Sequence, residues 1–130
     1  MRLHEVLEAL GRAGQKRECA VVHRHDLPDA EQPARDGRAI YFAGDTALFG
    51  DMRLIAEMYA PEIAFLPIGD HYTMDPAAAA KACLMLGVRQ VVPMHYGTFP
   101  ALTGRPDDLK RLVEPAGIDV LVLEPGETAQ

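Results

Sequence analysis

The sequence contains no tryptophan and only two cysteines among its 130 residues. Cys19 and Cys83 are isolated and form no Cys-x-x-Cys pair, so nothing indicates a disulfide framework or a thiolate metal site. A cytoplasmic protein with reduced thiols is the simplest interpretation. Cys83 falls within a helical pattern, and we expect it to be a small buried hydrophobic residue.

Basic residues are also scarce: 13 Lys and Arg stand against 19 Asp and Glu, which gives a net charge of -6. This balance argues against a general binder of nucleic acid or of anionic membranes. No apolar run is long enough to span a bilayer, and charged residues interrupt the start of the chain, where a signal peptide would be apolar. Hydrophobic residues make up 48% of the chain, enough for the core of a single domain.

Residues 1–37 carry weak structural signals. Apolar residues at helical spacing predict a short amphipathic helix within residues 1–12, and residues 19–22 could form a strand. His23 and His25 would share one face of a strand and could chelate a metal. A solvated polar loop is the interpretation that we favour for them, because short motifs often mislead.

From residue 38 onward, strand-like and helical patterns alternate. Apolar runs predict strands at residues 39–42, 63–68, 90–93 and 119–123, with helices between them that begin near Asp51, Asp75 and Pro106. Both aspartates are expected N-caps, and Gly87 is expected to end the middle helix. Such alternation predicts an α/β fold with helices packed on a largely parallel sheet.

Three of these predicted strands are followed closely by polar residues in the next loop. The runs end in Gly44-Asp45-Thr46, in Gly69-Asp70-His71 and in Met94-His95. If the strands are parallel neighbours, these tips lie along the one edge where open α/β sheets bind ligands. Carboxylate and imidazole suit zinc, manganese or iron. The pattern therefore predicts a metal or acid/base site built from Asp45 and His95, with His71 nearby.

Each of these residues also has an ordinary structural interpretation. Asp45 could be a turn aspartate that bonds its own backbone, and a single histidine is more often structural than a ligand. Two ligands are fewer than the roughly three that a catalytic zinc takes from protein. His71 could be the third ligand or could contact substrate, and Asp70 could orient a histidine or close its own loop.

Residues 38–100 resemble the C-terminal half of metallo-β-lactamase-fold metal-dependent hydrolases, and the ascorbate-6-phosphate lactonase-like branch is the most similar one. The matching stretches are Ile40-Tyr41-Phe42-Ala43-Gly44-Asp45-Thr46, Phe49-Gly50-Asp51-Met52, Leu66-Pro67-Ile68-Gly69-Asp70-His71-Tyr72-Thr73-Met74 and Pro93-Met94-His95-Tyr96-Gly97-Thr98-Phe99-Pro100. Several ordered motifs over about half of the chain make the resemblance specific.

The resemblance implies a fold and a set of roles. Residues 38–130 would form one half of an αββα sandwich, behind a poorly matched segment of residues 1–37. Asp45 would be the catalytic ligand that bridges two metal ions, zinc before manganese or iron, and His95 would bind one of them. His71, Asp70 and Thr46 would contact a small-molecule substrate. A metal-bound hydroxide would attack a lactone, ester, amide or phosphoester.

The chain also departs from the family pattern. It has no His-x-His-x-Asp-His motif, which supplies most of the family's metal ligands from the N-terminal half. We therefore expect a truncated relative, inactive alone, or one half of a two-chain enzyme. A half sandwich would expose an apolar sheet face, which predicts self-association or a partner chain.

Two other functions stay open at this point. The chain could be a non-catalytic relative that acts as an interaction or structural module and needs no complete site. It could also be a different α/β enzyme in which Asp45 and His95 act as an acid/base pair without metal. No nucleophile motif such as Gly-x-Ser-x-Gly supports the latter.

Overall fold

A computed structural model describes residues 20–21 and 39–128 of the chain. It contains a sheet with the strand order β1-β2-β3-β4-β5. The strands are β1 (Ala20–Val21), β2 (Ile40–Phe42), β3 (Ile63–Pro67), β4 (Gln90–Met94) and β5 (Asp119–Val120). β1 pairs antiparallel with β2, and all the other neighbours pair in parallel. The predicted alternation around a largely parallel sheet is confirmed.

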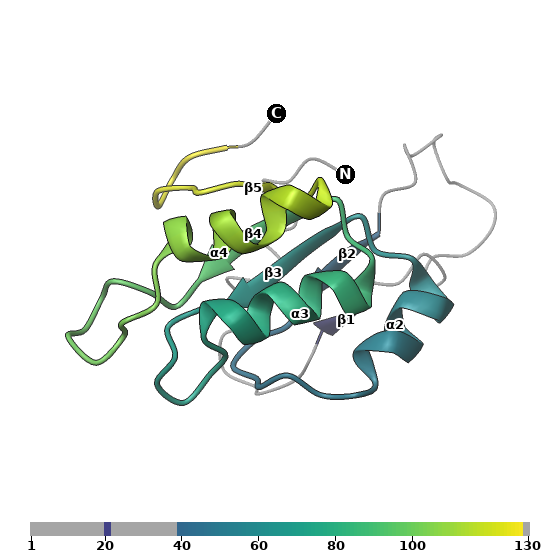
Figure 1. Ribbon diagram of the computed structural model, residues 1–130, viewed down its shortest axis with the longest axis horizontal. Coiled ribbons are helices and arrows are strands. Elements are labelled where there is room, and N and C mark those ends of the chain that lie inside the picture. The colour runs from purple at the N-terminus through teal and green to yellow at the C-terminus, as the bar shows by residue number, and fades with distance from the viewer. Residues whose placement is uncertain (1–19, 22–38, 129–130) are drawn as a thin grey trace.

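The helices lie between the parallel strands in the chain. They are α2 (Met52–Tyr59), α3 (Pro76–Leu86) and α4 (Pro106–Val113), and the 3-10 turn η1 (Glu114–Ala116) follows α4. Figure 1 shows the three α-helices side by side on one face of the sheet. Strand, helix and parallel strand follow one another as in βαβ units, so β2, β3, β4 and β5 end at the same edge of the sheet.

The helix ends match the sequence signals in part. The Asp75 side chain accepts a hydrogen bond from the backbone N–H of Ala78 at 2.6 Å and so caps α3. Gly87 ends α3 in the left-handed conformation, with φ 68°. Asp51 stands at the N-cap position of α2, as predicted, but it does not act as a cap: its backbone is already helical, and its side chain makes no capping bond. An N-cap residue needs an extended backbone to turn its carboxylate toward the first N–H groups.

The main core lies between the sheet and the helices. Alternate side chains of β2, β3 and β4 face the helices and pack against small and medium-sized residues of α3 and α4. Every residue of β3 is buried, as expected for a central parallel strand. Cys83 is 0% exposed within this core, which confirms its predicted place as a small buried hydrophobic residue.

The opposite sheet face carries a second apolar cluster. Ile63, Phe65 and Val92 are buried there, and partly buried apolar residues surround them: Ile40, Phe42, Met94, Leu121 and Leu123. The prediction that a second copy or a partner chain covers this face stays a prediction.

The last strand is shorter than predicted. β5 ends at Val120, although the N–H of Leu121 still donates to the carbonyl of Val91 at 2.9 Å. Regular strand pairing therefore stops before the predicted limit of residue 123, although Leu121 and Leu123 still pack against the sheet face. The predicted helix within residues 1–12 and the motif of His23 and His25 lie outside the described residues.

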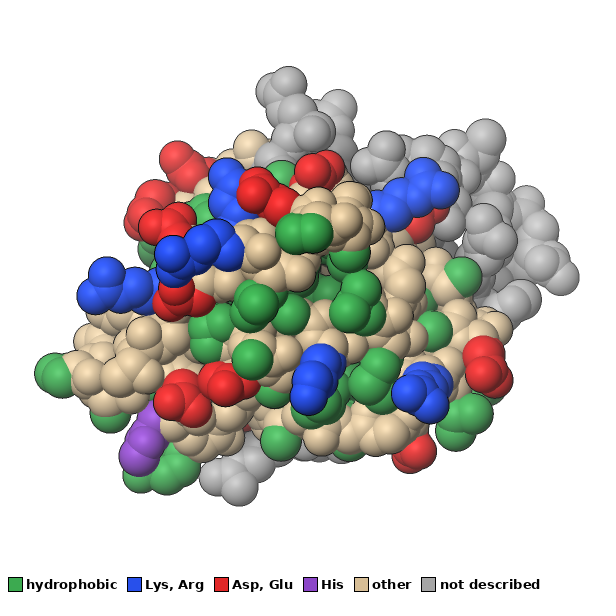
Figure 2. Space-filling view, in the orientation of Figure 1, with side chains coloured by type: hydrophobic (Ala, Val, Ile, Leu, Met, Phe, Trp, Pro, Cys, Tyr) green, Lys and Arg blue, Asp and Glu red, His purple; other side chains and the backbone are tan. Residues whose placement is uncertain are grey.

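The helical face of the molecule is mixed in character. Figure 2 shows acidic and basic side chains interspersed with apolar ones over this face. Leu54, Met58 and Leu84 are exposed on α2 and α3. No helix in residues 39–128 combines the length and the apolar character needed to cross a membrane.

Candidate functional site

The loops that follow β2, β3 and β4 meet at the carboxyl edge of the sheet. Backbone hydrogen bonds continue past the strand ends. The N–H of Ala43 donates to the carbonyl of Phe65, and the N–H of Ile68 donates to the carbonyl of Met94, each at 3.0 Å. These bonds keep the strand tips in register as the chain turns away from the sheet. The polar residues that end the three strands are thereby brought to one side of the molecule, as parallel pairing predicts.

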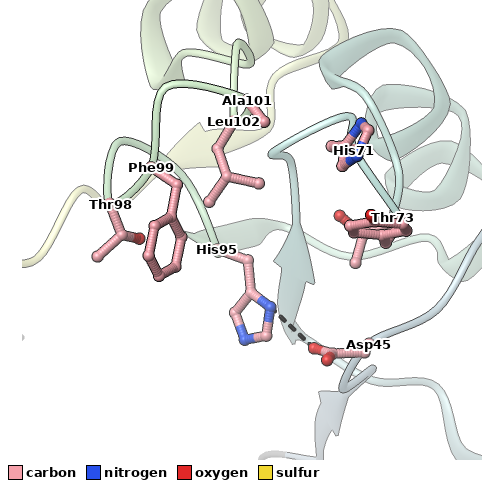
Figure 3. Close-up of a pocket in the computed structure, with 9 residues that line it drawn as sticks. Asp45, His71, Thr73, His95, Thr98, Phe99, Ala101 and Leu102 are labelled. Atoms are coloured by element: carbon pink, nitrogen blue, oxygen red, sulfur yellow. Dashed lines mark ion pairs between the residues drawn. The ribbon is translucent and has the colours of Figure 1, made fainter.

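Asp45 and His95 contact each other directly at this edge. The Nδ1 atom of His95 lies 2.8 Å from Oδ1 of Asp45 (Figure 3). Both side chains reach solvent, with 46% of His95 and 69% of Asp45 exposed. A hydrogen bond to a carboxylate requires the proton on Nδ1, so in the neutral imidazole the lone pair is on Nε2. Nε2 is then free to bind a metal or to accept a proton.

The backbone of the site is strained. His95 has φ 54°, and Asp70 and Tyr72 in the loop after β3 have φ 76° and 65°. Among the described residues, these are three of the four non-glycine positions with positive φ. Left-handed backbone costs a non-glycine residue about 1–2 kcal/mol, and such strain gathers where function requires it.

Two glycines let the site loops pack against the strand ends. A Cβ atom on Gly69 would overlap the carbonyl oxygen of His95, and one on Gly104 would overlap the carbonyl oxygen of Ile68. Only glycine permits such a close approach of two backbones. The loop between β4 and α4 is therefore held against the end of β3 through the backbone of His95.

A cleft of about 620 Å³ opens beside the Asp45–His95 pair. The described residues that line it are Asp45, His71, Tyr72, Thr73, His95, Thr98, Phe99, Ala101 and Leu102. Figure 3 shows His71 and Thr73 on one side and Phe99 and Leu102 on the other. The hydroxyl oxygen of Thr73 is buried without a hydrogen-bond partner, and a buried polar atom without a partner costs about 1–3 kcal/mol.

The structure separates the residues predicted to contact substrate. His71 lines the cleft, but Asp70 and Thr46 are not among its described lining residues. Asp70 accepts a hydrogen bond from the hydroxyl of Thr103 at 3.4 Å, and the hydroxyl of Thr46 donates to the carbonyl of Ala47 at 3.2 Å. The substrate roles of Asp70 and Thr46 stay predictions.

Sequence reasoning missed the apolar side of the cleft. Phe99, Ala101 and Leu102 form a wall in the loop that begins at His95, and Tyr72 follows His71 directly. The signal was present, because this loop leaves the carboxyl end of a parallel strand, where ligands bind. We assigned no role to these residues because apolar side chains carry no chemical signature in a sequence.

Tyr96 follows His95 and packs against the main core. Burial, with the Glu124 carboxylate as a second cause, raises the pKa of the Tyr96 hydroxyl above its ordinary value. The phenol therefore stays neutral at physiological pH and anchors the residue after His95 without adding charge to the site.

The donor atoms of the site suit a divalent metal ion in kind. A carboxylate and an imidazole with a free Nε2 are ligands that zinc accepts. Their number is smaller than a metal site needs: within residues 39–128, no three His, Cys, Asp or Glu side chains cluster closely enough to hold an ion. The described residues therefore offer two neighbouring donors of a suitable kind, Asp45 and His95, which are fewer than a complete metal site needs.

Comparisons with known proteins agree with this fold. Residues 32–96 match the model of the β-lactamase superfamily domain. The chain is 58% identical over 95 residues to a UPF0173 metal-dependent hydrolase of Solibacter usitatus, which covers 73% of this chain and 41% of that protein. It is 45% identical over 119 residues to a UPF0173 metal-dependent hydrolase of Koribacter versatilis, 82% of this chain and 50% of that protein.

A solved structure extends the comparison to the fold. Igni18, a metallo hydrolase from Ignicoccus hospitalis, superposes with a TM-score of 0.69 and 39% sequence identity. The match covers 97% of this chain and 65% of Igni18. The chain thus spans half or less of the two curated relatives and about two thirds of Igni18.

Proposed function

Because the chain belongs to the metallo-β-lactamase superfamily, we propose that Asp45 and His95 are metal ligands in the active site of a metal-dependent hydrolase. The observation that carries this proposal is the 2.8 Å contact between the two side chains at the carboxyl edge of the sheet. The likeness to UPF0173 metal-dependent hydrolases supports it. Zinc is the metal that the carboxylate and imidazole donors fit best, with manganese and iron as alternatives.

The substrate in this proposal is a small lactone, ester or phosphoester. Hydrolysis consumes one water: its oxygen bonds to the acyl carbon or phosphorus, the bond to the leaving oxygen breaks, and that oxygen takes up a proton. A bound divalent ion would supply Lewis-acid activation for this reaction. The carboxylate of Asp45 and one imidazole nitrogen of His95 would hold the ion, and the cleft walls would hold the substrate beside the pair.

The remaining ligands would come from outside the described residues, on this chain or on another one. The strain at His95 supports its own role as a ligand. Left-handed backbone destabilises a histidine, and such strain gathers at functional sites.

Metal titration tests the proposal. Zinc added to the metal-free chain, with binding measured by calorimetry at a known oligomeric state, should bind at least about tenfold more weakly to Asp45→Asn and to His95→Gln, because even loss of an outer-shell partner costs about 10- to 100-fold. The matched control is Asp119→Asn, which removes an exposed carboxylate at the start of β5, away from the carboxyl edge, and should leave the affinity within about twofold. Unchanged zinc binding in both ligand variants would overturn the assignment.

The same contact favours a second candidate function. Oriented by Asp45, His95 could act as a general base toward water without any metal. The two functions separate in strong chelator, where an acid/base enzyme keeps its hydrolase activity and a metal-dependent one loses it. A chain that binds no metal and hydrolyses nothing, alone or with a partner chain, would instead be a structural or interaction module.

A further inference from the structure

Asp45 and His95 are open to another molecule from the solvent side. Their side chains are 69% and 46% exposed at the carboxyl edge of the sheet (Figure 3). Donor atoms on one tetrahedral zinc lie about 3.3 Å apart, so a pair at 2.8 Å needs little rearrangement to share an ion. Among the described residues, no third His, Cys, Asp or Glu side chain lies close enough to join them. The donors that complete the site therefore come from elsewhere in this chain or from another molecule.

The direction of β1 argues against the pair His23 and His25 as the source of those donors. β1 is antiparallel to β2, and Val21 lies opposite Tyr41, farther from the carboxyl edge than the preceding pair of residues. The strand therefore runs away from the edge that holds Asp45 as it approaches His23 in the chain. A second molecule needs no return of the chain, because it meets the exposed pair directly.

Large aromatic side chains lie beside the pair and are exposed to water. Tyr72 is 92% exposed on the loop after β3, and Phe99 is 68% exposed on the loop between β4 and α4. Both line the same cleft as Asp45 and His95. Aromatic residues are enriched in protein interfaces, because each ring buries a large area when a partner covers it. Two such rings beside an incomplete metal site favour a protein partner at this edge.

The two aromatic side chains are presented by ordered loops. A hydrogen bond of 3.0 Å from the N–H of Leu102 to the carbonyl of Phe99 closes a tight turn. On the other loop, the rings of His71 and Tyr72 pack edge to face with centroids 4.0 Å apart. A surface that is organised before association loses less entropy when a partner arrives.

A second copy of this chain brings donors of the right number and charge. A twofold axis at this edge places two carboxylates and two imidazoles together, four donors in all. A catalytic zinc takes about three protein ligands and keeps a further position open for water. The two Asp45 carboxylates would repel each other in a dimer without metal, and the double positive charge of a zinc ion balances them. Association through this edge is therefore expected to depend on the ion.

We propose that a zinc ion joins two copies of this chain at the carboxyl edge, with Asp45 and His95 of each copy around the ion and with Tyr72 and Phe99 of each copy in the interface. The inference rests on the proposed function for the metal-binding roles of Asp45 and His95, and it adds the source of the missing donors. The active site then belongs to the dimer, and each separate chain holds half of it.

Sedimentation of the full chain with and without zinc tests the dimer. The mass of one chain is 14.2 kDa. At micromolar protein concentration, zinc should double the mass measured in chelator, and calorimetry should give one zinc ion per two chains. Asp45→Asn and His95→Gln should each prevent the doubling. An unchanged mass at saturating zinc, one zinc ion bound per chain, or doubling that persists in either variant would overturn the proposal.

Variants of the aromatic residues test the interface. Tyr72→Ser combined with Phe99→Ser should raise the protein concentration needed for zinc-dependent doubling by at least about fivefold, because buried aromatic anchors are lost. The matched control is Leu54→Ser combined with Leu84→Ser, which removes two exposed apolar side chains of α2 and α3 away from the cleft. The control should leave the doubling unchanged. Equal association of the aromatic double variant and the unmodified chain would contradict the proposed interface.

The outcomes separate this proposal from the proposed function. If one zinc ion binds per chain without doubling, and Asp45→Asn and His95→Gln weaken that binding, the dimer is wrong and the two ligand roles stand. If a variant that lacks His23 and His25 then binds zinc more weakly as well, the chain itself completes the site. If neither Asp45→Asn nor His95→Gln changes zinc binding, both proposals fail, whatever the measured mass.

Discussion

The backbone of Gly69 lies against the carbonyl group of His95, so closely that a methyl group at position 69 would overlap the carbonyl oxygen. The loop after β3 thus contacts the backbone of His95, while Asp45 contacts its ring. Two contacts from different strand ends restrain one residue. The position of His95 therefore depends on the register of the sheet as well as on its own loop.

Gly69→Ala should destabilise the protein by about 1–3 kcal/mol, because overpacking forces the backbone of one loop to move. The matched control is Gly50→Ala, since no atom lies within 4 Å of a Cβ placed there and its φ is ordinary. Urea unfolding would measure both changes. Equal stability of the two variants would show that the His95 loop moves aside at no cost.

His95→Gly should be more stable than His95→Ala by about 1 kcal/mol. Glycine relieves the left-handed strain at φ 54°, and its larger unfolded-state entropy offsets part of the gain. At Thr98, which is not a positive-φ position, the order should reverse, with Thr98→Ala more stable than Thr98→Gly. Both pairs can be compared by urea unfolding in chelator, and the same order at both positions would contradict the role of strain.

Asp75→Ala should cost about 0.5–2 kcal/mol because it removes the capping bond to the N–H of Ala78. Asp51→Ala provides the comparison, since Asp51 also precedes a helix but makes no capping bond, and its cost should stay within about 0.5 kcal/mol. Thermal unfolding of the two variants measures the difference. A similar loss from both would mean that the Asp75 bond contributes nothing.

Burial raises the pKa of the Cys83 thiol from 9.0 to about 12. Because the folded protein favours the neutral thiol, the stability that Cys83 contributes is fully present below about pH 9 and is lost as the pH rises toward 12. The stability difference between the unmodified chain and Cys83→Ala should therefore fall by up to about 1.4 kcal/mol per pH unit above pH 9. Urea unfolding at pH 7, 9.5 and 10.5 would measure it, and a difference independent of pH would be the contrary result.

Much of the fold could be predicted because its signals are local. Apolar runs bounded by glycine and proline predict β3 and β4, and the Asp75-Pro76 pair predicts the start of α3. Signals that depend on backbone geometry were less reliable. Asp51 has the composition of a cap, but its helical backbone turns the carboxylate away from that role.

The sequence by itself determined which elements form, and it placed a carboxylate and an imidazole directly after two strands, because helical and strand periodicities are properties of neighbouring residues. Only the tertiary structure decided that Asp45 and His95 touch at 2.8 Å, and that Phe99 and Tyr72 face one cleft. The physical reason is that these contacts join residues far apart in the chain. Sheet register brings their strands together, and Gly69 and Gly104 each let one loop backbone lie against another segment.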